Sequence, residues 1–224
     1  MAAGEKKDVA VGGAHESGLT ARSRLPARRS YDKAMSTEPP VREILTFWFG
    51  EPPLVERDVW FRKDSAFDAT IRARFGEAIA SACAGAFGEW CHDPHGALAR
   101  VILLDQFTRN VYRGTAEAFY GDERALATAD DAIAKGFDRA LAPVERWFLY
   151  MPFVHSEDPA MQERALARFD ALATETGLAS PLEWTKRHAD VIRRFGRFPH
   201  RNAILGRTST PEEIAFLATQ GSTF

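Results

Sequence analysis

The sequence predicts an all-α fold in which antiparallel helical hairpins stack as a bundle without a regular repeat. Prolines follow a helix-capping side chain at Asp93-Pro94, Asp158-Pro159, Ser180-Pro181 and Thr210-Pro211. Proline at the first helical position costs no hydrogen bond, so these pairs mark helix starts. Apolar residues recur at three- and four-residue spacing, and we find no segment of five residues that alternates between apolar and polar. Both patterns favour helices over strands.

The first three helices are expected at residues 39–49, 64–84 and 94–109. Gly50 marks the end of the first, because glycine accepts the left-handed backbone found there. The second carries apolar residues four positions apart, at Phe67, Ile71, Phe75 and Ile79. The third follows the Asp93 cap and has a broad apolar face.

The later helices are expected at residues 122–135, 143–151, 159–176, 181–196 and 211–219. Pro143 occupies a first-turn position, and Pro152 weakens the helix that Pro143 begins. Thr210 and Glu213 have capping-box spacing. Stop signals are the glycines Gly136, Gly177 and Gly221. Short connections between these helices favour antiparallel neighbours.

The sequence predicts that residues 1–36 form a disordered extension and that residues 37–224 form a single all-helical domain. The extension contains almost no large apolar residues and no helical period, so it cannot bury enough surface to order itself. Met35 is a second plausible translation start.

The composition excludes several classes of protein. A net charge of −2 gives no general attraction to nucleic acid or to anionic membranes, so we expect neither partner. No apolar run is long enough to span a bilayer, and no secretory signal is recognisable, which favours the cytoplasm. Two cysteines cannot form a disulfide framework. The oligomeric state is left open.

Polar residues emerge directly from the apolar third helix, at Asp105, Gln106, Arg109 and Asn110. Asp105, Arg109 and Arg113 share one face if the helix continues, with Gln106 and Asn110 in the adjacent row. This pattern indicates a polar wall that faces a cavity and offers an arginine fork to an anion. The alternative is structural: an Asp105–Arg109 pair, with Asn110 capping the helix end.

His155 and Glu157 follow the buried run that ends at Val154. Histidine suits proton transfer at neutral pH, and Glu157 is a candidate partner, so both are catalytic candidates. The alternative is that Ser156 and Glu157 cap the helix that begins at Pro159.

An arginine-rich run extends from Arg187 to Arg207, with six arginines against one acid. Within it, Arg201, Asn202 and Arg207 are candidates for binding phosphate or carboxylate, and His200 is a second candidate base. The alternatives are pairing of these arginines with internal acids, and a basic face for RNA. Aromatic residues are not regularly interleaved, which counts against RNA.

The sequence contains no recognisable motif for metal, nucleotide or acyl-enzyme chemistry. His92 and His95 flank Asp93, but Asp93 is interpreted as a helix cap. We therefore expect neither a metal nor a cofactor. His188 lies on the apolar face of its helix, where a hydrogen-bonded core histidine is the more frequent situation.

Four separated motifs resemble the bacterial domain of unknown function 924 family. They are Phe47-Trp48-Phe49-Gly50 with Trp60-Phe61, Leu104-Asp105-Gln106-Phe107 with Arg109-Asn110, the run Tyr150 to Glu157, and Phe198-Pro199-His200-Arg201-Asn202 with Leu205-Gly206-Arg207. The resemblance covers about residues 41–219. It implies a tetratricopeptide-like helical fold and no established activity, and its motifs contain the same polar residues.

Three hypotheses for function follow. The first is a binding module whose Arg, His and Asn side chains line a concavity for an acidic or phosphorylated small molecule or peptide. The second is a hydrolase or transferase with His155 or His200 as general base and Arg109 or Arg201 stabilising negative charge. The third is a scaffold in which these arginines pair internally. A histidine bonded to an acid inside an enclosed pocket favours the second, and an open groove with apolar subsites favours a peptide binder.

Overall fold

The computed structural model describes residues 41–219. The predicted extension over 1–36, the start at Met35 and the stop signal at Gly221 lie outside this range. Within it the chain is built of helices and contains no strand, so the all-α prediction is confirmed. The α-helices are α1 (Val41–Phe49), α2 (Ser65–Cys83), α3 (Pro94–Val101), α4 (Thr108–Val111), α5 (Asp122–Ala134), α6 (Pro143–His155), α7 (Pro159–Thr176), α8 (Ser180–Phe195) and α9 (Pro211–Leu217).

Shorter helical segments connect the α-helices. The five 3-10 segments of the described chain are η1 (Asp58–Trp60), η2 (Gly88–His92), η4 (Ala116–Phe119), η5 (Phe137–Ala140) and η6 (Pro199–Arg201). The segment η3 (Ile102–Phe107) is a π-helix that links α3 to α4. The predicted helix over 94–109 is therefore continuous as far as Val111, but it is wider in its middle. Such π-helical insertions are rare and often lie at functional sites.

The start signals act mostly as expected. The Oδ1 of Asp93 accepts from the backbone N–H of His95 and Gly96 at 3.0 Å, and Asp158 caps α7 in the same way. The Thr210–Glu213 capping box is present. The prediction that Ser180 caps α8 is wrong. The helix begins at Ser180 itself, and the Ser180 hydroxyl donates to Glu56 at 3.2 Å.

The helix that begins at Pro143 continues through Pro152 to His155, four residues beyond its expected end. Proline removes one backbone hydrogen bond from a helix interior. Here Phe148, Leu149 and Phe153 are buried on both sides of Pro152 along the chain, and their packing holds the helix together across the proline. Because the helix does not break, His155 is fixed at the last position of α6.

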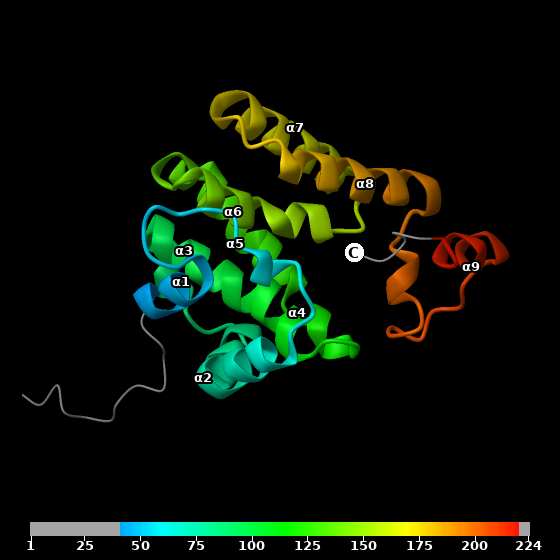
Figure 1. The fold of residues 1–224 in the computed structure, drawn as a ribbon, viewed down its shortest axis with the longest axis horizontal. Coiled ribbons are helices and arrows are strands. Elements are labelled where there is room, and N and C mark those ends of the chain that lie inside the picture. The colour runs from blue at the N-terminus through cyan, green and yellow to red at the C-terminus, as the bar shows by residue number, and fades with distance from the viewer. Residues whose placement is uncertain (1–40, 220–224) are drawn as a thin grey trace, which may run out of the picture. The chain divides into compact units, whose positions relative to one another are not determined.

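Helices α6, α7 and α8 lie side by side as successive antiparallel hairpins (Figure 1). On the other side of α6, the segments α3 and η3 pack against α5 and α2 around an aromatic core. There Trp48 makes edge-on contacts with Phe107 and Phe148 at ring-centroid distances of 5.6 and 5.4 Å. This central position of η3 brings its polar residues next to the end of α6.

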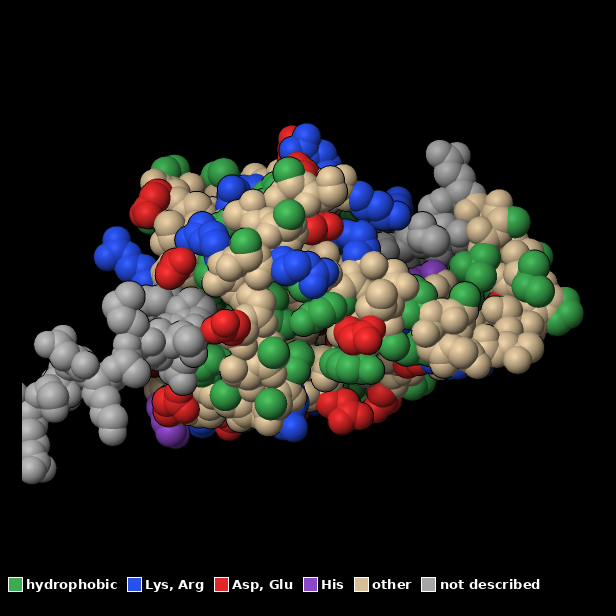
Figure 2. Space-filling model, turned by 90° about the horizontal axis from the view of Figure 1, so that it is seen from below, with side chains coloured by type: hydrophobic (Ala, Val, Ile, Leu, Met, Phe, Trp, Pro, Cys, Tyr) green, Lys and Arg blue, Asp and Glu red, His purple; other side chains and the backbone are tan. Residues whose placement is uncertain are grey.

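The surface carries charges of both signs. Basic and acidic side chains are interspersed with apolar ones on the face seen in Figure 2. Over residues 41–219, no helix is both long enough and apolar enough to cross a membrane.

Candidate functional site

A fully buried carboxylate is hydrogen-bonded to a histidine from a distant part of the chain. Asp105 of η3 has no solvent exposure, and its Oδ1 lies 2.7 Å from Nδ1 of His155 at the end of α6. Nη1 of Arg109 lies 3.0 Å from the same oxygen, and the Gln106 side-chain amide donates to the other one at 2.5 Å. The π-helix and the unbroken α6 together place this Asp–His pair.

The protonation states of the pair follow from its surroundings. Burial alone raises the pKa of Asp105, but Arg109 and His155 outweigh it and lower the pKa to about 2. Burial, reinforced by the charge of Arg109, lowers the pKa of His155 below its ordinary 6.5 despite the opposing effect of Asp105. At neutral pH Asp105 is therefore an anion that only accepts, so His155 donates through Nδ1–H and keeps Nε2 as an acceptor.

Asp122 and Arg201 extend the group of charged side chains around Arg109. The Nη2 of Arg109 donates to Asp122, the first residue of α5, at 3.0 Å. Nη1 of Arg201 approaches Asp122 only to 3.7 Å. The guanidinium of Arg201 instead lies against the rings of Phe119 and Phe198, 4.8 and 4.5 Å from their centroids.

Arg201 is deeply buried for a cation. It is 7% exposed, and its Nε has no hydrogen-bond partner within the described chain. Burial and the neighbouring Arg109 lower its pKa to about 10, so it still carries its charge at neutral pH. This arginine is held mainly by aromatic contacts.

Two further histidines approach His155. The His188 ring of α8 lies 6.3 Å from that of His155, and its Nδ1–H donates to the Trp184 carbonyl at 2.8 Å. His200 of η6 stacks obliquely on Phe198 at 5.6 Å. Burial lowers the pKa of His188 to about 3 and that of His200 to about 4, so both are neutral. His188 has the backbone partner expected of a core histidine, but it also borders a cavity.

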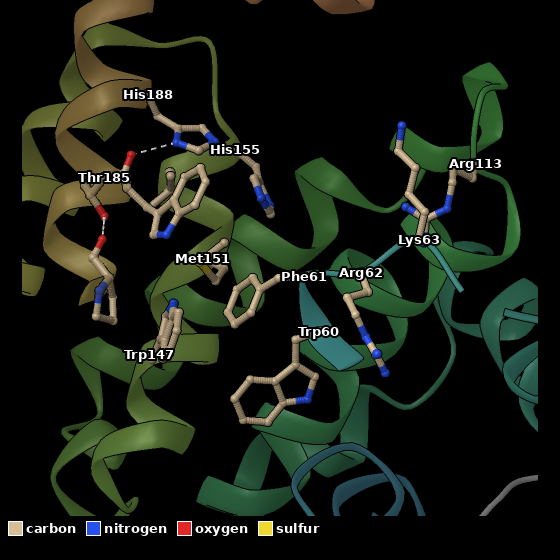
Figure 3. A pocket seen from close by; sticks show the side chains of 13 residues that line it. Trp60, Phe61, Arg62, Lys63, Arg113, Trp147, Met151, His155, Thr185 and His188 are labelled. Atoms are coloured by element: carbon tan, nitrogen blue, oxygen red, sulfur yellow. Dashed lines mark hydrogen bonds between the residues drawn. The ribbon is translucent and has the colours of Figure 1, made fainter. Parts of the chain in front are cut away.

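That cavity, hereafter the aromatic pocket, has a volume of about 420 Å³. Its walls combine aromatic side chains, three cations and two histidines: Trp60, Phe61, Trp147, Trp184, Arg62, Lys63, Arg113, His155 and His188, with Met151, Val154, Pro181 and Thr185 between them. In Figure 3 the α8 residues Thr185 and His188 lie on one side of the pocket and the cations lie on the other. His155 and Phe61 lie between these two sides.

The cations of the aromatic pocket differ in their partners. Arg113 pairs with Asp68 through two contacts of 3.1 Å. Arg62 and Lys63 are exposed, and no carboxylate within residues 41–219 pairs with either side chain. Two positive charges at the mouth of an apolar cavity are therefore available to an anion.

Several predicted site residues lie outside this cluster. Asn110 donates to Asp68 at 2.7 Å, so it faces α2 and does not belong to the wall formed by Asp105 and Arg109. Glu157 forms two bonds with Arg207, at 2.6 and 3.0 Å, and is not the partner of His155. It does not cap α7 either, because Asp158 does.

The arginine-rich run from Arg187 to Arg207 contains residues that pair internally and residues that lie near the candidate site. Nε of Arg207 donates to Asn202 at 2.9 Å, and Asn202 also contacts Glu213 at 3.2 Å. Arg207 and Asn202 therefore pair with other residues of the chain. The Arg207–Glu157 pair connects the C-terminal loop to the turn after α6. Arg201 and His200 from the same run instead approach the Asp105–His155 pair.

Sequence reasoning missed most of the pocket walls. Trp60 and Phe61 belong to a recognised motif, but nothing in the pattern of Trp147 or Trp184 separates a cavity wall from core. Asp122 has the position of an ordinary acidic residue in a first helical turn. Arg62 and Lys63 resemble any exposed basic pair. No group of three or more His, Cys, Asp or Glu side chains within residues 41–219 is arranged to hold a metal ion.

Comparisons with known proteins agree with this architecture. A model of the family described as bacterial protein of unknown function (DUF924) matches residues 44–221. The chain is 42% identical to a protein of unknown function, ATU0120 from Agrobacterium tumefaciens, whose structure is solved. That similarity covers 80% of this chain and 96% of the other, with a TM-score of 0.71. No curated protein matches. On the strength of a family match over most of its length, the chain belongs to the DUF924 family of bacterial proteins, whose function is unknown.

Proposed function

We propose that this protein binds an amphipathic small molecule that carries an anionic group, and that the aromatic pocket is its binding site. The observation that carries the proposal is the lining of that pocket, in which aromatic walls meet cations without carboxylate partners. A volume of about 420 Å³ lies within the range typical of small-molecule sites. This size favours a small molecule over an extended peptide.

The apolar part of the ligand would occupy the region between the aromatic walls. Phe61 stacks on Trp147 at 5.6 Å, and Trp60 meets Trp147 edge-on at 6.1 Å, which gives a fixed surface. Phe61 and Trp184 are 51% and 44% exposed, an unusual exposure for such large side chains. Covering apolar surface contributes about 25 cal/mol per Å².

The anionic group would lie at the cationic side. Arg62 and Lys63 lose no ion pair when they bind an acid, because no carboxylate of the described chain holds them. Next to apolar walls their attraction for an anion is stronger than on an open surface. A carboxylate or a phosphate meets this requirement equally well.

Isothermal titration calorimetry with 4-phenylbutyrate tests the proposal, with 4-phenylbutanol as its uncharged counterpart. We expect 4-phenylbutyrate to bind more tightly than the alcohol. The double variant Arg62→Ala/Lys63→Ala should weaken binding of the acid by about tenfold or more and leave binding of the alcohol unchanged, since a charged contact contributes about 1.5–3 kcal/mol.

Trp184→Ala should weaken binding of both compounds, because it removes apolar wall without changing charge. Lys186→Ala is the matched control, since Lys186 is an exposed cation that pairs with Glu183 and does not line the pocket. Equal affinity of the double variant and the wild-type protein for the acid would contradict the proposal, as would failure of both compounds to bind at millimolar concentration.

A further inference from the structure

We propose that the aromatic pocket is also a hydrolytic site, in which His155 acts as general base on a carboxylic ester of an amphipathic, anionic compound. The inference rests on the proposed function, because it requires that compound to occupy the pocket. It goes further by assigning a reaction and a catalytic residue. Asp105 is assigned as a positioning residue that acts through His155.

The first step of the argument is the orientation of the imidazole. Nδ1 of His155 is committed to Oδ1 of Asp105 at 2.7 Å, on the buried side of the ring. The ring itself lines the pocket and is directed into it in Figure 3. The nitrogen that remains, Nε2, is therefore the one presented to a bound molecule. A base held in one tautomer by a carboxylate is a recurrent catalytic arrangement.

The second step is the state of the carboxylate. A buried anion with no partners would be costly, but Asp105 receives hydrogen bonds from Gln106 and His155 and an ion pair from Arg109. It therefore stays ionised when His155 takes up a proton and stabilises the imidazolium that forms. A buried carboxylate hydrogen-bonded to a histidine that lines a cavity favours a role in proton transfer.

The third step is the nucleophile. No serine or cysteine lines the aromatic pocket. Thr185 is only 1% exposed, and its hydroxyl donates to the Pro181 carbonyl at 2.9 Å. Water is then the nucleophile. As its oxygen bonds to the ester carbonyl carbon, His155 Nε2 takes one of its protons. The tetrahedral intermediate expels the alkoxide by breaking the carbon–oxygen bond, and Nε2–H returns the proton to that alkoxide. The products are an acid and an alcohol, and His155 is neutral again.

The arrangement favours a carboxylic ester over a phosphoester. Phosphoryl transfer requires positive charge around the reacting phosphoryl group. In Figure 3 the cations that line the pocket, Arg62, Lys63 and Arg113, lie to one side of His155. Arg109, the cation beside His155, is held by Asp105 and Asp122 and does not line the pocket. This places the anionic group of the substrate away from the bond that is cleaved.

The test uses the mono-4-nitrophenyl ester of glutaric acid, which carries a free carboxylate and releases coloured 4-nitrophenolate. We expect wild-type protein to hydrolyse it with turnover, and His155→Gln to lower kcat/KM by about 100-fold or more, the usual contribution of a general base. His92→Gln is the matched control, because His92 is exposed and does not line the pocket. It should hydrolyse the ester at the wild-type rate.

The dependence of kcat/KM on pH distinguishes whether Asp105 positions and charges His155 or only supports the fold. The charged and titratable groups around His155 are Asp105 and Arg109 on η3 and α4, Asp122 on α5, His188 on α8, and His200 and Arg201 on η6. For wild-type protein, kcat/KM should rise through a pKa below 6.5 and stay level above it, since neutral His155 is the active form. Asp105→Asn removes the charge that raises this pKa, so the inflection should move to lower pH as the rate falls. A loss of rate with an unmoved inflection would overturn the role assigned to Asp105.

Binding of 4-phenylbutyrate is measured on the same samples. If wild-type protein binds it but hydrolyses the ester no faster than His155→Gln does, the hydrolytic inference is wrong and the proposed function stands. If neither occurs, the proposed function fails as well. Hydrolysis of 4-nitrophenyl phosphate in place of the ester would overturn the assigned substrate class. Circular dichroism checks folding, and His155→Gln decides the question if Asp105→Asn does not fold.

Discussion

His188 has a pKa of about 3 because it is buried beside other basic groups, although an exposed histidine titrates near 6.5. Its folded-state pKa is lowered, so between these two values the unfolded chain binds a proton that the folded chain does not. Stability from this residue is therefore complete above pH 6.5 and decreases as the pH falls toward 3.

We predict that the free energy of unfolding falls as the pH is lowered from about 6 to 4, and that His188→Gln makes the decrease less steep by about 1.4 kcal/mol per pH unit, the value for one proton. Urea denaturation at several pH values measures both slopes. Glutamine retains a donor for the Trp184 carbonyl, so its effect on packing is small. His92→Gln should leave the wild-type slope unchanged. An equal slope for His188→Gln and the wild-type protein would mean that His188 is accessible to protons in the folded state.

Individual residues differ in how far the sequence predicted their position and contacts. Asp105 and Arg109 were recognisable because ionisable groups follow an apolar helix without a break. The partner of His155 was not recognisable, since the sequence offers Glu157 two positions away while the structure uses Asp105 fifty positions away. Short spacing suggests a pair only when the intervening backbone permits it, and Glu157 lies beyond the helix end and faces Arg207.

At the scale of elements, the π-helix and the start of α5 are in unusually close contact. A Cβ atom at Gly121 would collide with the carbonyl oxygen of Leu104, which belongs to η3. Gly121 needs no special backbone angle, with φ of −88°, so glycine is required here for space alone. This contact brings Asp122 within reach of Arg109 and so completes the charge cluster behind the Asp–His pair.

Gly121→Ala should destabilise the protein by about 1–3 kcal/mol, because the methyl group pushes α5 away from η3. Gly76→Ala is the contrasting substitution: Gly76 lies within α2, where an added Cβ meets nothing within 4 Å. That change should stabilise the protein by about 0.4–1 kcal/mol through lower entropy of the unfolded chain. Thermal unfolding of both variants gives the comparison. Equal effects of the two would show that α5 tolerates displacement from η3.

The positions at which helices start were predictable from a few neighbouring residues. Whether a helix continues past a proline, or widens into a π-helix, was not. Aspartate before proline at residues 93 and 158 correctly predicted starts, because capping depends on a few neighbouring atoms. Pro152 was expected to weaken its helix, yet buried packing of α6 prevails over the missing hydrogen bond. The π-helical insertion at η3 lies within a buried apolar segment whose sequence pattern indicates an ordinary α-helix.

At the scale of the whole molecule, the candidate site is a product of tertiary structure. Its residues come from η1 and the loop after it, η3, α4, α6, α8 and η6, which the helical hairpins bring together. The sequence indicated polar residues that were out of place, but could not indicate the aromatic walls, since tryptophans in core and in cavities follow the same helical spacing. Membership of the DUF924 family supplies the fold and leaves the chemistry to be established.

The most direct test of a single ligand site is a ¹H–¹⁵N spectrum of the tryptophan indoles, of which the chain has five. During titration with 4-phenylbutyrate, the signals of Trp60, Trp147 and Trp184 should shift progressively, because these rings line the aromatic pocket. The signal of Trp90, which stacks on Phe87 at 4.2 Å and does not line it, should stay in place. Absence of shifts at millimolar ligand, or shifts of Trp90 as large as those of the other three, would contradict the assignment of the pocket.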